Sequence, residues 1–237
     1  MALAGSAVGQ QAASAPSSPP SPPISRAEQA LFQDEHLKDL RPPVQLQYEF
    51  ERRSAVTGDP VAPFRDKVSL QFGARPDGSC CTTQGQFLSS QRAMPLPDIE
   101  AATANPVILF FLEREVRELQ RVTGGQSAHF RRRIRLALAD AAQVSATTVR
   151  YGGRDLSATE VRITPYLDDP VRARFAAYAA THYQFILCSQ VPGGVFSIRT
   201  TVPAAGGETG GETRGENKAD RPPRSEETLS LLPTSPG

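Results

Sequence analysis

The chain has 237 residues, with 26 lysine and arginine residues against 25 aspartate and glutamate residues, and a formal net charge of +1. This near-neutrality excludes a uniformly basic nucleic-acid-binding protein and a strongly acidic solvating protein. The length suits one domain or two small ones, and 39% hydrophobic residues is enough to build a core. No run of residues approaches the roughly 18 apolar side chains that a membrane-spanning helix needs, so the chain is not expected to span a membrane.

The first 24 residues form a leader without charge. They contain five prolines and no charged side chain, which predicts a disordered segment. Residues 3–9 also resemble the end of a secretory signal peptide whose charged start and most of whose apolar core are missing. We therefore expect residues 1–24 to be a disordered leader that contains the remnant of a signal peptide, and the protein to be periplasmic. The alternative is a plain leader on a cytoplasmic protein.

The folded part is expected to begin near residue 25. Ser25 and Glu28 have the spacing of a capping box, in which each side chain binds a free backbone N–H at the start of a helix. The helix that follows is predicted to end before Pro42.

Alternation of apolar and polar side chains predicts the strands. The clearest run is 44–50, in which four apolar side chains alternate with glutamine and glutamate. Similar patterns predict further strands at 68–72, 80–88, 149–151, 161–163, 183–187 and 196–202.

Two long helices are predicted in the middle of the chain. Asn105 and Pro106 form a helix start, and the pair Gly124-Gly125 ends that helix. A second helix over 127–138 completes an αα-hairpin. A further helix is predicted from residue 168 to about residue 180.

These elements predict an α+β fold. A single domain at 25–203 is expected to hold a mainly antiparallel sheet of about seven strands, with the αα-hairpin and two further helices packed on one face. A curved sheet with the helices in its concave side is the favoured arrangement. Residues 204–237, rich in glycine, glutamate and proline, are predicted to be a disordered tail.

The cysteines and histidines do not form a known motif. Cys80 and Cys81 are adjacent, Cys188 is distant, and no C-x-x-C spacing occurs. In an exported protein, a disulfide from Cys80 or Cys81 to Cys188 is one prediction, and three unpaired thiols are the alternative. The three histidines lie on separate predicted elements, so neither a metal site nor a cofactor is expected.

Arginine is concentrated in the second half of the chain. Residues 107–203 hold 13 arginines against eight acidic residues, a local balance of +5. Arg150, Arg162 and Arg199 are expected on the polar faces of predicted strands, where neighbouring guanidinium groups would suit a carboxylate or phosphate ligand. The alternative is a solvated face. Nucleic acid is not an expected partner, because no aromatic interleaving accompanies the basic residues.

The function predicted from these features is a non-enzymatic binding or structural role in the bacterial cell envelope, with an unknown protein or an anionic ligand as the partner. One alternative is a carrier of a lipid or lipoprotein, whose pocket would be lined by Tyr48, Phe50, Phe72, Phe185 and Phe196. Another is a hydrolase or transferase of unknown type that uses Arg150, Arg162 or His182. No catalytic residue is predicted, because the sequence shows no convergent set of titratable groups.

Overall fold

The computed structural model describes residues 23–57, 59, 61–204 and 222–233. In that part of the chain, nine strands form one antiparallel sheet in the order β4-β3-β2-β1-β9-β8-β7-β6-β5. The strands are β1 (Val44–Ser54), β2 (Phe64–Ala74), β3 (Cys80–Phe87), β4 (Met94–Pro95), β5 (Gln143–Tyr151), β6 (Arg154–Ile163), β7 (His182–Leu187), β8 (Val195–Val202) and β9 (Ser225–Leu231).

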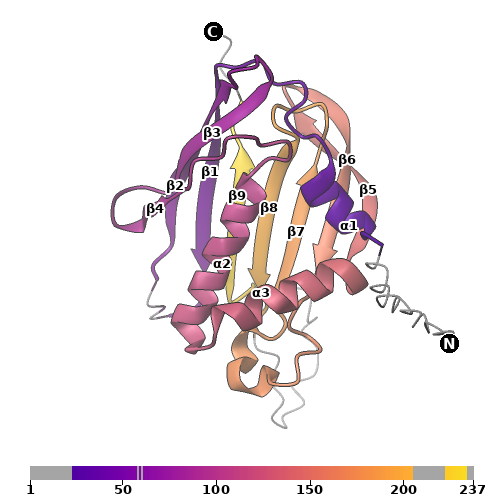
Figure 1. Ribbon diagram of the computed structural model, residues 1–237. Coiled ribbons are helices and arrows are strands. Elements are labelled where there is room, and N and C mark those ends of the chain that lie inside the picture. The colour runs from indigo at the N-terminus through magenta and orange to yellow at the C-terminus, as the bar shows by residue number, and fades with distance from the viewer. Residues whose placement is uncertain (1–22, 58, 60, 205–221, 234–237) are drawn as a thin grey trace, which may run out of the picture.

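The helices lie over one face of the sheet (Figure 1). They are α1 (Arg26–Glu28), which continues through Gln29–Gln33, α2 (Val107–Thr123), and α3 (Ser127–Leu136), which continues through Ala137–Ala141. A single turn occurs at Ser90–Arg92 and a longer 3₁₀ segment at Arg172–Tyr178. The predicted α+β class with a mainly antiparallel sheet is confirmed, whereas the sheet has nine strands and not seven.

The strand β9 joins the two halves of the sheet. Strands β1 to β4 and β5 to β8 each follow one another in space as they do in sequence, and β9 pairs with β1 on one side and with β8 on the other. Because β9 lies within 204–237, the prediction of a disordered tail is wrong for Ser225–Leu231. Residues 1–22 of the predicted leader lie outside the described part of the chain. Only its last two residues, Pro23 and Ile24, are described.

The starts of α1 and α2 follow the capping residues found in the sequence, whereas the first helix ends at Gln33, well before Pro42. Ser25 and Glu28 form the predicted capping box, and the Ser25 hydroxyl also donates to the carbonyl of Leu138 at 2.8 Å. The side-chain oxygen of Asn105 accepts a hydrogen bond from the backbone N–H of Val107 at 3.1 Å. These contacts fix where α1 and α2 begin, and α1 is held against the end of the α3 segment.

The helix predicted at 168–180 forms only in part. Its 3₁₀ segment is interrupted at Phe175, whose backbone leaves the helical region. The Phe175 ring instead packs edge-on against Phe130 of α3, with 5.6 Å between ring centroids. Burial of this aromatic side chain is therefore favoured over a regular helix.

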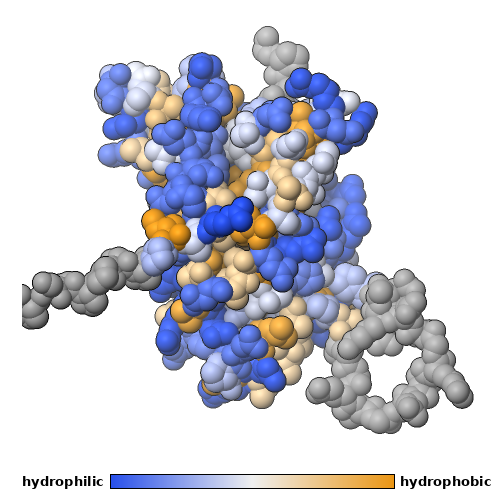
Figure 2. Space-filling view, turned by 90° about the vertical axis from the view of Figure 1, so that its right-hand side faces the viewer, coloured by the Kyte–Doolittle hydropathy of each residue, from blue (hydrophilic) through white to orange (hydrophobic). Residues whose placement is uncertain are grey.

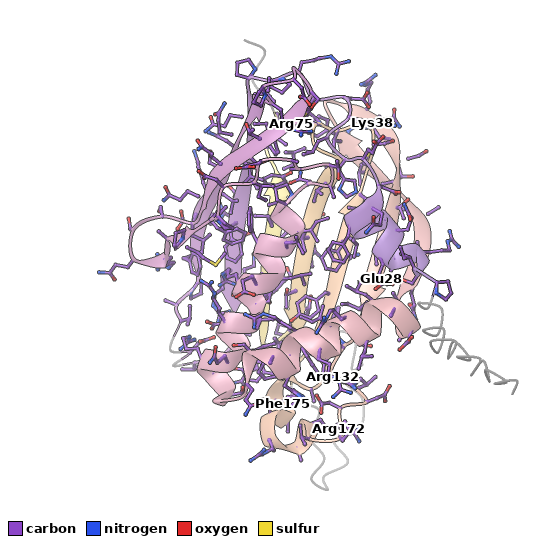
Figure 3. All side chains as sticks on the ribbon, in the orientation of Figure 1. Glu28, Lys38, Arg75, Arg132, Arg172 and Phe175 are labelled. Carbon is purple, nitrogen blue, oxygen red and sulfur yellow. A yellow bond between two sulfur atoms is a disulfide. The ribbon has the colours of Figure 1, made fainter. Side chains whose placement is uncertain are left out.

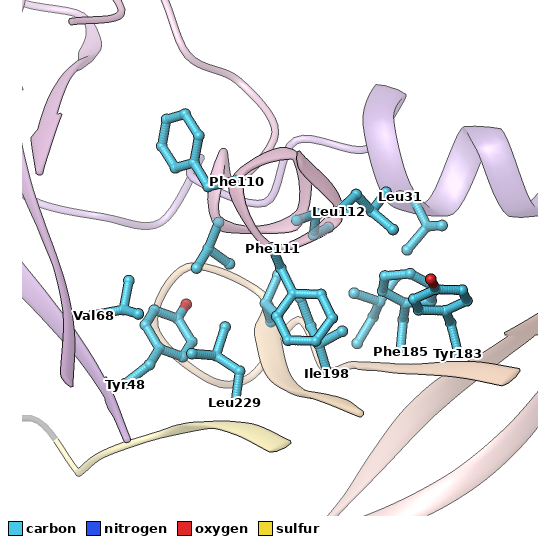
Figure 4. Close-up of a cluster of buried hydrophobic side chains, with 14 of the residues drawn as sticks. Leu31, Tyr48, Val68, Phe110, Phe111, Leu112, Tyr183, Phe185, Ile198 and Leu229 are labelled. Carbon is cyan, nitrogen blue, oxygen red and sulfur yellow. The ribbon is translucent and has the colours of Figure 1, made fainter. Parts of the chain in front are cut away.

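A continuous apolar core fills the space between the sheet and the helices. Phe111 of α2 approaches the ring of Phe50 on β1, with 6.4 Å between centroids. In Figure 4, Phe111 lies over the sheet near Ile198, and Leu31 lies over Tyr183. Burial of these large side chains supplies the main force that holds the helices on the sheet.

Candidate functional site

A row of polar side chains crosses the buried face of the sheet. Arg52 on β1 pairs in register with Glu227 on β9, Glu227 pairs with Thr200 on β8, and Thr200 pairs with Tyr183 on β7. We call these four residues the polar row. All four are buried, although three of them are polar residues in a face that is otherwise apolar.

The polar row continues the alternation of its strands. Arg52 occupies the next inward position after Tyr48 and Phe50, and Thr200 lies between the inward-facing Ile198 and Val202. Because side chains point to the same face at every second residue, these polar groups must enter the core once their strands pair.

Helix α2 places two charged residues above the row. Glu115 lies among Leu112, Val116 and Leu119 on the buried side of α2, and Arg114 lies beside it. The Arg114 guanidinium lies over the ring of Phe50, 4.5 Å from its centroid. Helix and sheet therefore meet through charged groups at this point and through apolar groups elsewhere.

Ion pairs connect the helix to the sheet. Arg114 donates from Nη2 to Glu227 Oε1 at 3.1 Å and from Nη1 to Glu115 Oε1 at 2.7 Å, and it also pairs through Nη1 with Glu227 Oε2. Arg52 donates from Nη2 to Asp59 Oδ2 at 2.9 Å and from Nη1 to Glu227 Oε1 at 3.4 Å. We call Arg52, Asp59, Arg114, Glu115 and Glu227 the charged cluster. Each charged side chain in this cluster thus contacts a side chain of opposite charge, as burial requires.

The pKa values of the two buried glutamates are shifted in opposite directions. Burial raises the pKa of Glu115 well above its usual value of 4.5, and the nearby charge of Glu227 raises it further. Burial also opposes ionisation of Glu227, but the charge of Arg114 outweighs that effect and lowers the pKa of Glu227. Glu115 is therefore the member of the pair that holds a proton more firmly.

A pocket opens beside the polar row. It has a volume of about 60 Å³, and Arg52, Thr200, Glu115 and Glu227 are among its lining residues. The Nε of Arg52 and the Oγ1 of Thr200 are buried without a hydrogen-bond partner in the described part of the chain. Arg52 and Thr200 both line the pocket, and each has a buried polar atom without a hydrogen-bond partner among the described residues, which is rare in folded proteins.

Among the described residues, no group of three or more histidine, cysteine, aspartate or glutamate side chains has an arrangement that could hold a metal ion. The carboxylates of the cluster are instead occupied by guanidinium groups. The charged cluster instead provides hydrogen-bond donors and acceptors at fixed positions.

Two of the three predicted ligand-binding arginines lie in one row on the other face of the sheet. Arg162 on β6 pairs in register with Gln184 on β7, which pairs with Arg199 on β8. Each is neutralised in part, Arg162 by Glu160 at 2.7 Å and Arg199 by Glu226 at 3.9 Å. Ligand binding by this pair stays a prediction.

Arg150 lies apart from that pair. It faces Asp155 in the β5–β6 hairpin, with 3.0 Å between its Nη1 and Oδ1, whereas the neighbour of Arg162 on β5 is Gln143 at the opposite end of the strand. Burial lowers the pKa of the His182 imidazole, and the nearby charge of Arg162 lowers it further. Arg150 is therefore remote from Arg162, and a catalytic role for Arg150, Arg162 or His182 stays a prediction.

The cysteines lie at two places in the fold. Cys80 and Cys81 are adjacent at the start of β3, where their sulfur atoms meet, and Cys188 is a buried free thiol. The predicted bridge from Cys80 or Cys81 to Cys188 is not formed in the described part of the chain. Cys188 lies in the chain directly after β7, where its burial among apolar groups accounts for its presence.

The aromatic residues assigned to a carrier pocket belong to the core. Tyr48, Phe50, Phe72 and Phe185 are completely buried, and Phe196 packs at the margin of the same cluster. The Tyr48 hydroxyl accepts a hydrogen bond from the side-chain amide of Asn105 at 2.9 Å. These side chains hold the helices on the sheet in this structure.

Sequence reasoning missed the polar row, although a signal for it is present. Thr200 interrupts an inward-facing apolar pattern, and Glu115 interrupts the apolar face of a helix. A charged residue at an inward position is informative because charges are rarely buried without a partner. The partners themselves, Arg52 and Glu227, are 175 residues apart and become neighbours only through β9.

The fold and the site define an antiparallel α+β protein with a charged cluster between its helical layer and its sheet. No protein-family model matches the chain, and no curated protein matches it. Among solved structures, the chain is similar to the lipoprotein LppX of Mycobacterium tuberculosis, with 8% sequence identity and a TM-score of 0.31. That alignment covers 81% of this chain and 86% of LppX, and at this score no functional argument rests on it.

Proposed function

We propose that the protein is a non-enzymatic binding protein of the bacterial cell envelope. Its ligand is a small molecule with acceptor oxygens, held between α2 and the polar row. The observation that supports this proposal is that two residues lining one pocket, Arg52 and Thr200, each have a buried polar atom without a hydrogen-bond partner in the described part of the chain. Leaving a buried donor unsatisfied costs about 1–3 kcal/mol, which a bound acceptor would recover.

The chemistry of the pocket favours a ligand that accepts hydrogen bonds. Arg52 Nε can only donate, and the Thr200 hydroxyl can donate as well as accept. The guanidinium groups of Arg52 and Arg114 already face the carboxyl groups of Asp59, Glu115 and Glu227. A single carboxylate oxygen or carbonyl oxygen is the simplest group that would satisfy both free donors.

The size of the pocket limits the ligand. A buried water needs about 10–15 Å³ of such volume, so a pocket of about 60 Å³ holds roughly four to six waters or a small organic acid in their place. An acyl chain does not fit unless α2 moves away from the sheet.

Binding is favoured over catalysis because the ionisable groups are engaged with one another. Arg114 is bound to two glutamates, and Arg52 is bound to Asp59 and Glu227. A general base or nucleophile would need a free position toward a substrate. Assignment to the envelope rests on the resemblance of residues 3–9 to the end of a signal peptide.

A lipid or lipoprotein carrier is the second candidate. It is favoured by the way the helices cover the apolar face of the sheet, since their separation would expose a large apolar surface. The charged cluster makes this part of the helix–sheet interface less costly to open than an apolar one, because charges regain hydration when they separate.

The test is a search for ligands by thermal unfolding. We expect a small carboxylate from a panel that includes formate, acetate, lactate and succinate to raise the Tm of the protein, because a ligand that binds only the native state stabilises it. Native mass spectrometry of protein purified from its own host should show an adduct of matching mass. Absence of both a Tm shift and an adduct would exclude a small polar ligand.

Two threonine variants localise the effect. Thr200→Val removes the hydroxyl at the pocket and should abolish the Tm shift. Thr83→Val is the matched control, because Thr83 also has a buried hydroxyl without a partner among the described residues but lies on β3, away from the pocket. A carrier would behave differently: it would bind an apolar fluorescent probe and be indifferent to Thr200→Val.

A further inference from the structure

Exposed aliphatic side chains gather at one end of the molecule. Among the described residues, three of the five large hydrophobic side chains that are exposed belong to α3 and to residues 164–181. They are Leu136, Leu167 and Val171, with 39%, 48% and 40% of their surface exposed. We call this region the α3 end. Isolated exposed leucines are common on protein surfaces, so their charged surroundings decide what they signify.

Those surroundings are basic. Residues 127–141 and 164–181 together contain six arginines and three aspartates. Asp169 is fully buried and is bound to His129 at 2.6 Å, so its charge does not face solvent. Arg132, Arg135, Arg172 and Arg174 are exposed, and Asp140 and Asp168 are the exposed acids of these two segments.

Specific contacts hold the two segments together as one surface. Arg133 on α3 donates to the carbonyl of Pro165 at 3.0 Å, and Phe130 packs edge-on against Tyr166 with 5.7 Å between centroids. Arg172 donates from Nη1 to the carbonyl of Leu167 at 2.7 Å. The loop is therefore fixed to α3, and its exposed side chains keep constant positions relative to the arginines of the helix.

The basic residues of the α3 end lie far from those at the other end of the molecule. Arg132 and Arg172 lie at the α3 end, whereas Arg75 and Lys38 lie at the opposite end (Figure 3). In Figure 2, the lower end of the molecule shows hydrophobic residues interspersed with hydrophilic ones. Aliphatic side chains between arginines are typical of surfaces that lie on a membrane, where the apolar groups enter the interface and the arginines bind lipid phosphates.

We propose that the α3 end docks on an anionic lipid surface. Each arginine near such a surface contributes about 1 kcal/mol, and the contribution falls as salt screens the charges. The exposed aliphatic groups would add an apolar contribution that salt does not weaken. No helix in the described part of the chain is long and apolar enough to cross a membrane, so the contact proposed is peripheral.

Vesicle binding tests the proposal directly. The full chain is mixed with vesicles of phosphatidylcholine alone or of phosphatidylcholine with phosphatidylglycerol, and the bound fraction is measured by flotation at low and high salt. We expect binding to the vesicles that contain phosphatidylglycerol, with weaker binding at high salt. Equal binding to both vesicles, or to neither, would overturn the proposal.

Matched variants locate the contact. Arg132→Ala/Arg172→Ala should weaken binding roughly 25-fold, at about fivefold for each arginine. Arg75→Ala/Lys38→Ala removes the same charge at the opposite end and should leave binding unchanged. Arg132→Lys/Arg172→Lys keeps the charge and should restore most of the binding, which separates loss of charge from loosening of the loop.

The apolar contribution has its own control. Leu167→Ser/Val171→Ser should reduce the binding that remains at high salt, whereas Leu109→Ser, at an equally exposed leucine on α2, should not. If the same arginines instead retain an acidic protein from the host and no variant affects vesicle binding, the surface binds a protein and the lipid proposal is wrong. Because none of these variants touches the pocket, this outcome is independent of the proposed function.

Discussion

Arg114 and Glu227 face each other across the boundary between α2 and the sheet, with Arg114 Nη2 3.1 Å from Glu227 Oε1, although they are 113 positions apart in the chain. Both side chains are almost completely buried. The contact fixes the position of the helix along β9, because a charge placed one turn away would have no partner in the core. The helical layer is thus positioned by charge as well as held by apolar burial.

Removing one partner should therefore cost more than removing both. Arg114→Leu leaves Glu227 with Arg52 as its remaining cation, and we expect it to lower the free energy of unfolding by about 3 kcal/mol. The double variant Arg114→Leu/Glu227→Leu should recover most of that loss. Urea unfolding of the two single variants and the double variant measures the coupling. Additive losses would show that the two residues do not depend on each other.

The raised pKa of Glu115 predicts how stability depends on pH. Above the usual value of 4.5, the native state keeps a proton that the unfolded state has released. The stability that protonation of Glu115 contributes is fully present below pH 4.5, and it is lost as the pH rises through the pKa of Glu115 in the native state. Glu115→Gln removes this titration, so its stability relative to the wild type should increase between pH 5 and pH 8, by at most about 1.4 kcal/mol per pH unit.

A surface glutamate gives the control of opposite sign. Hydrogen bonds from Arg131 lower the pKa of Glu113, so the stability it contributes is present above pH 4.5 and is lost as the pH falls. Glu113→Gln should therefore be less stable than the wild type by a constant amount between pH 5 and pH 8, and this difference should shrink as the pH falls below 4.5. A flat difference for Glu115→Gln over the same range would mean that Glu115 is ionised in the native state.

Asn105 joins three parts of the fold through one side chain. Its amide nitrogen donates to the Tyr48 hydroxyl at 2.9 Å and to the Gly193 carbonyl at 2.8 Å, and its oxygen caps α2 at Val107. We expect Asn105→Ala to lower the free energy of unfolding by about 3 kcal/mol, because all three contacts are lost and two buried groups remain unpaired. Tyr48→Phe removes one contact and should cost about 1 kcal/mol. Equal losses in the free energy of unfolding of Asn105→Ala and Tyr48→Phe would show that the other two contacts of Asn105 do not contribute to stability.

The cysteine arrangement predicts the number of free thiols. Protein recovered from an oxidising compartment should show one thiol that is alkylated only after denaturation, because Cys188 is buried and the other two are joined. Cys188→Ser should remove this signal. Mass spectrometry of the alkylated protein makes the measurement, and a bridge that includes Cys188 would instead leave a thiol at Cys80 or Cys81.

The sequence was sufficient for the local elements and insufficient for the site. The capping residues Ser25 and Asn105 and the alternation at 44–50 predict elements correctly because each depends on neighbours in the chain. The polar row depends on β9, whose inward positions begin with Ser225 and Glu227. Two polar residues at the start of a seven-residue strand conceal the alternation, so a pattern based on hydropathy assigns the segment to a tail.

The same strand supports the most stringent test of the fold. A chain truncated after residue 221 lacks β9, so the backbone groups of β1 and β8 that pair with it lose their partners, and Arg52 loses Glu227. We expect this truncation to abolish the folded monomer, since two long strand edges would be exposed in the middle of the sheet. Truncation after residue 233 keeps β9 and should leave the Tm unchanged. Size-exclusion chromatography and thermal unfolding compare the two chains, and a folded monomer in the shorter one would show that β9 is not required to join the halves of the sheet.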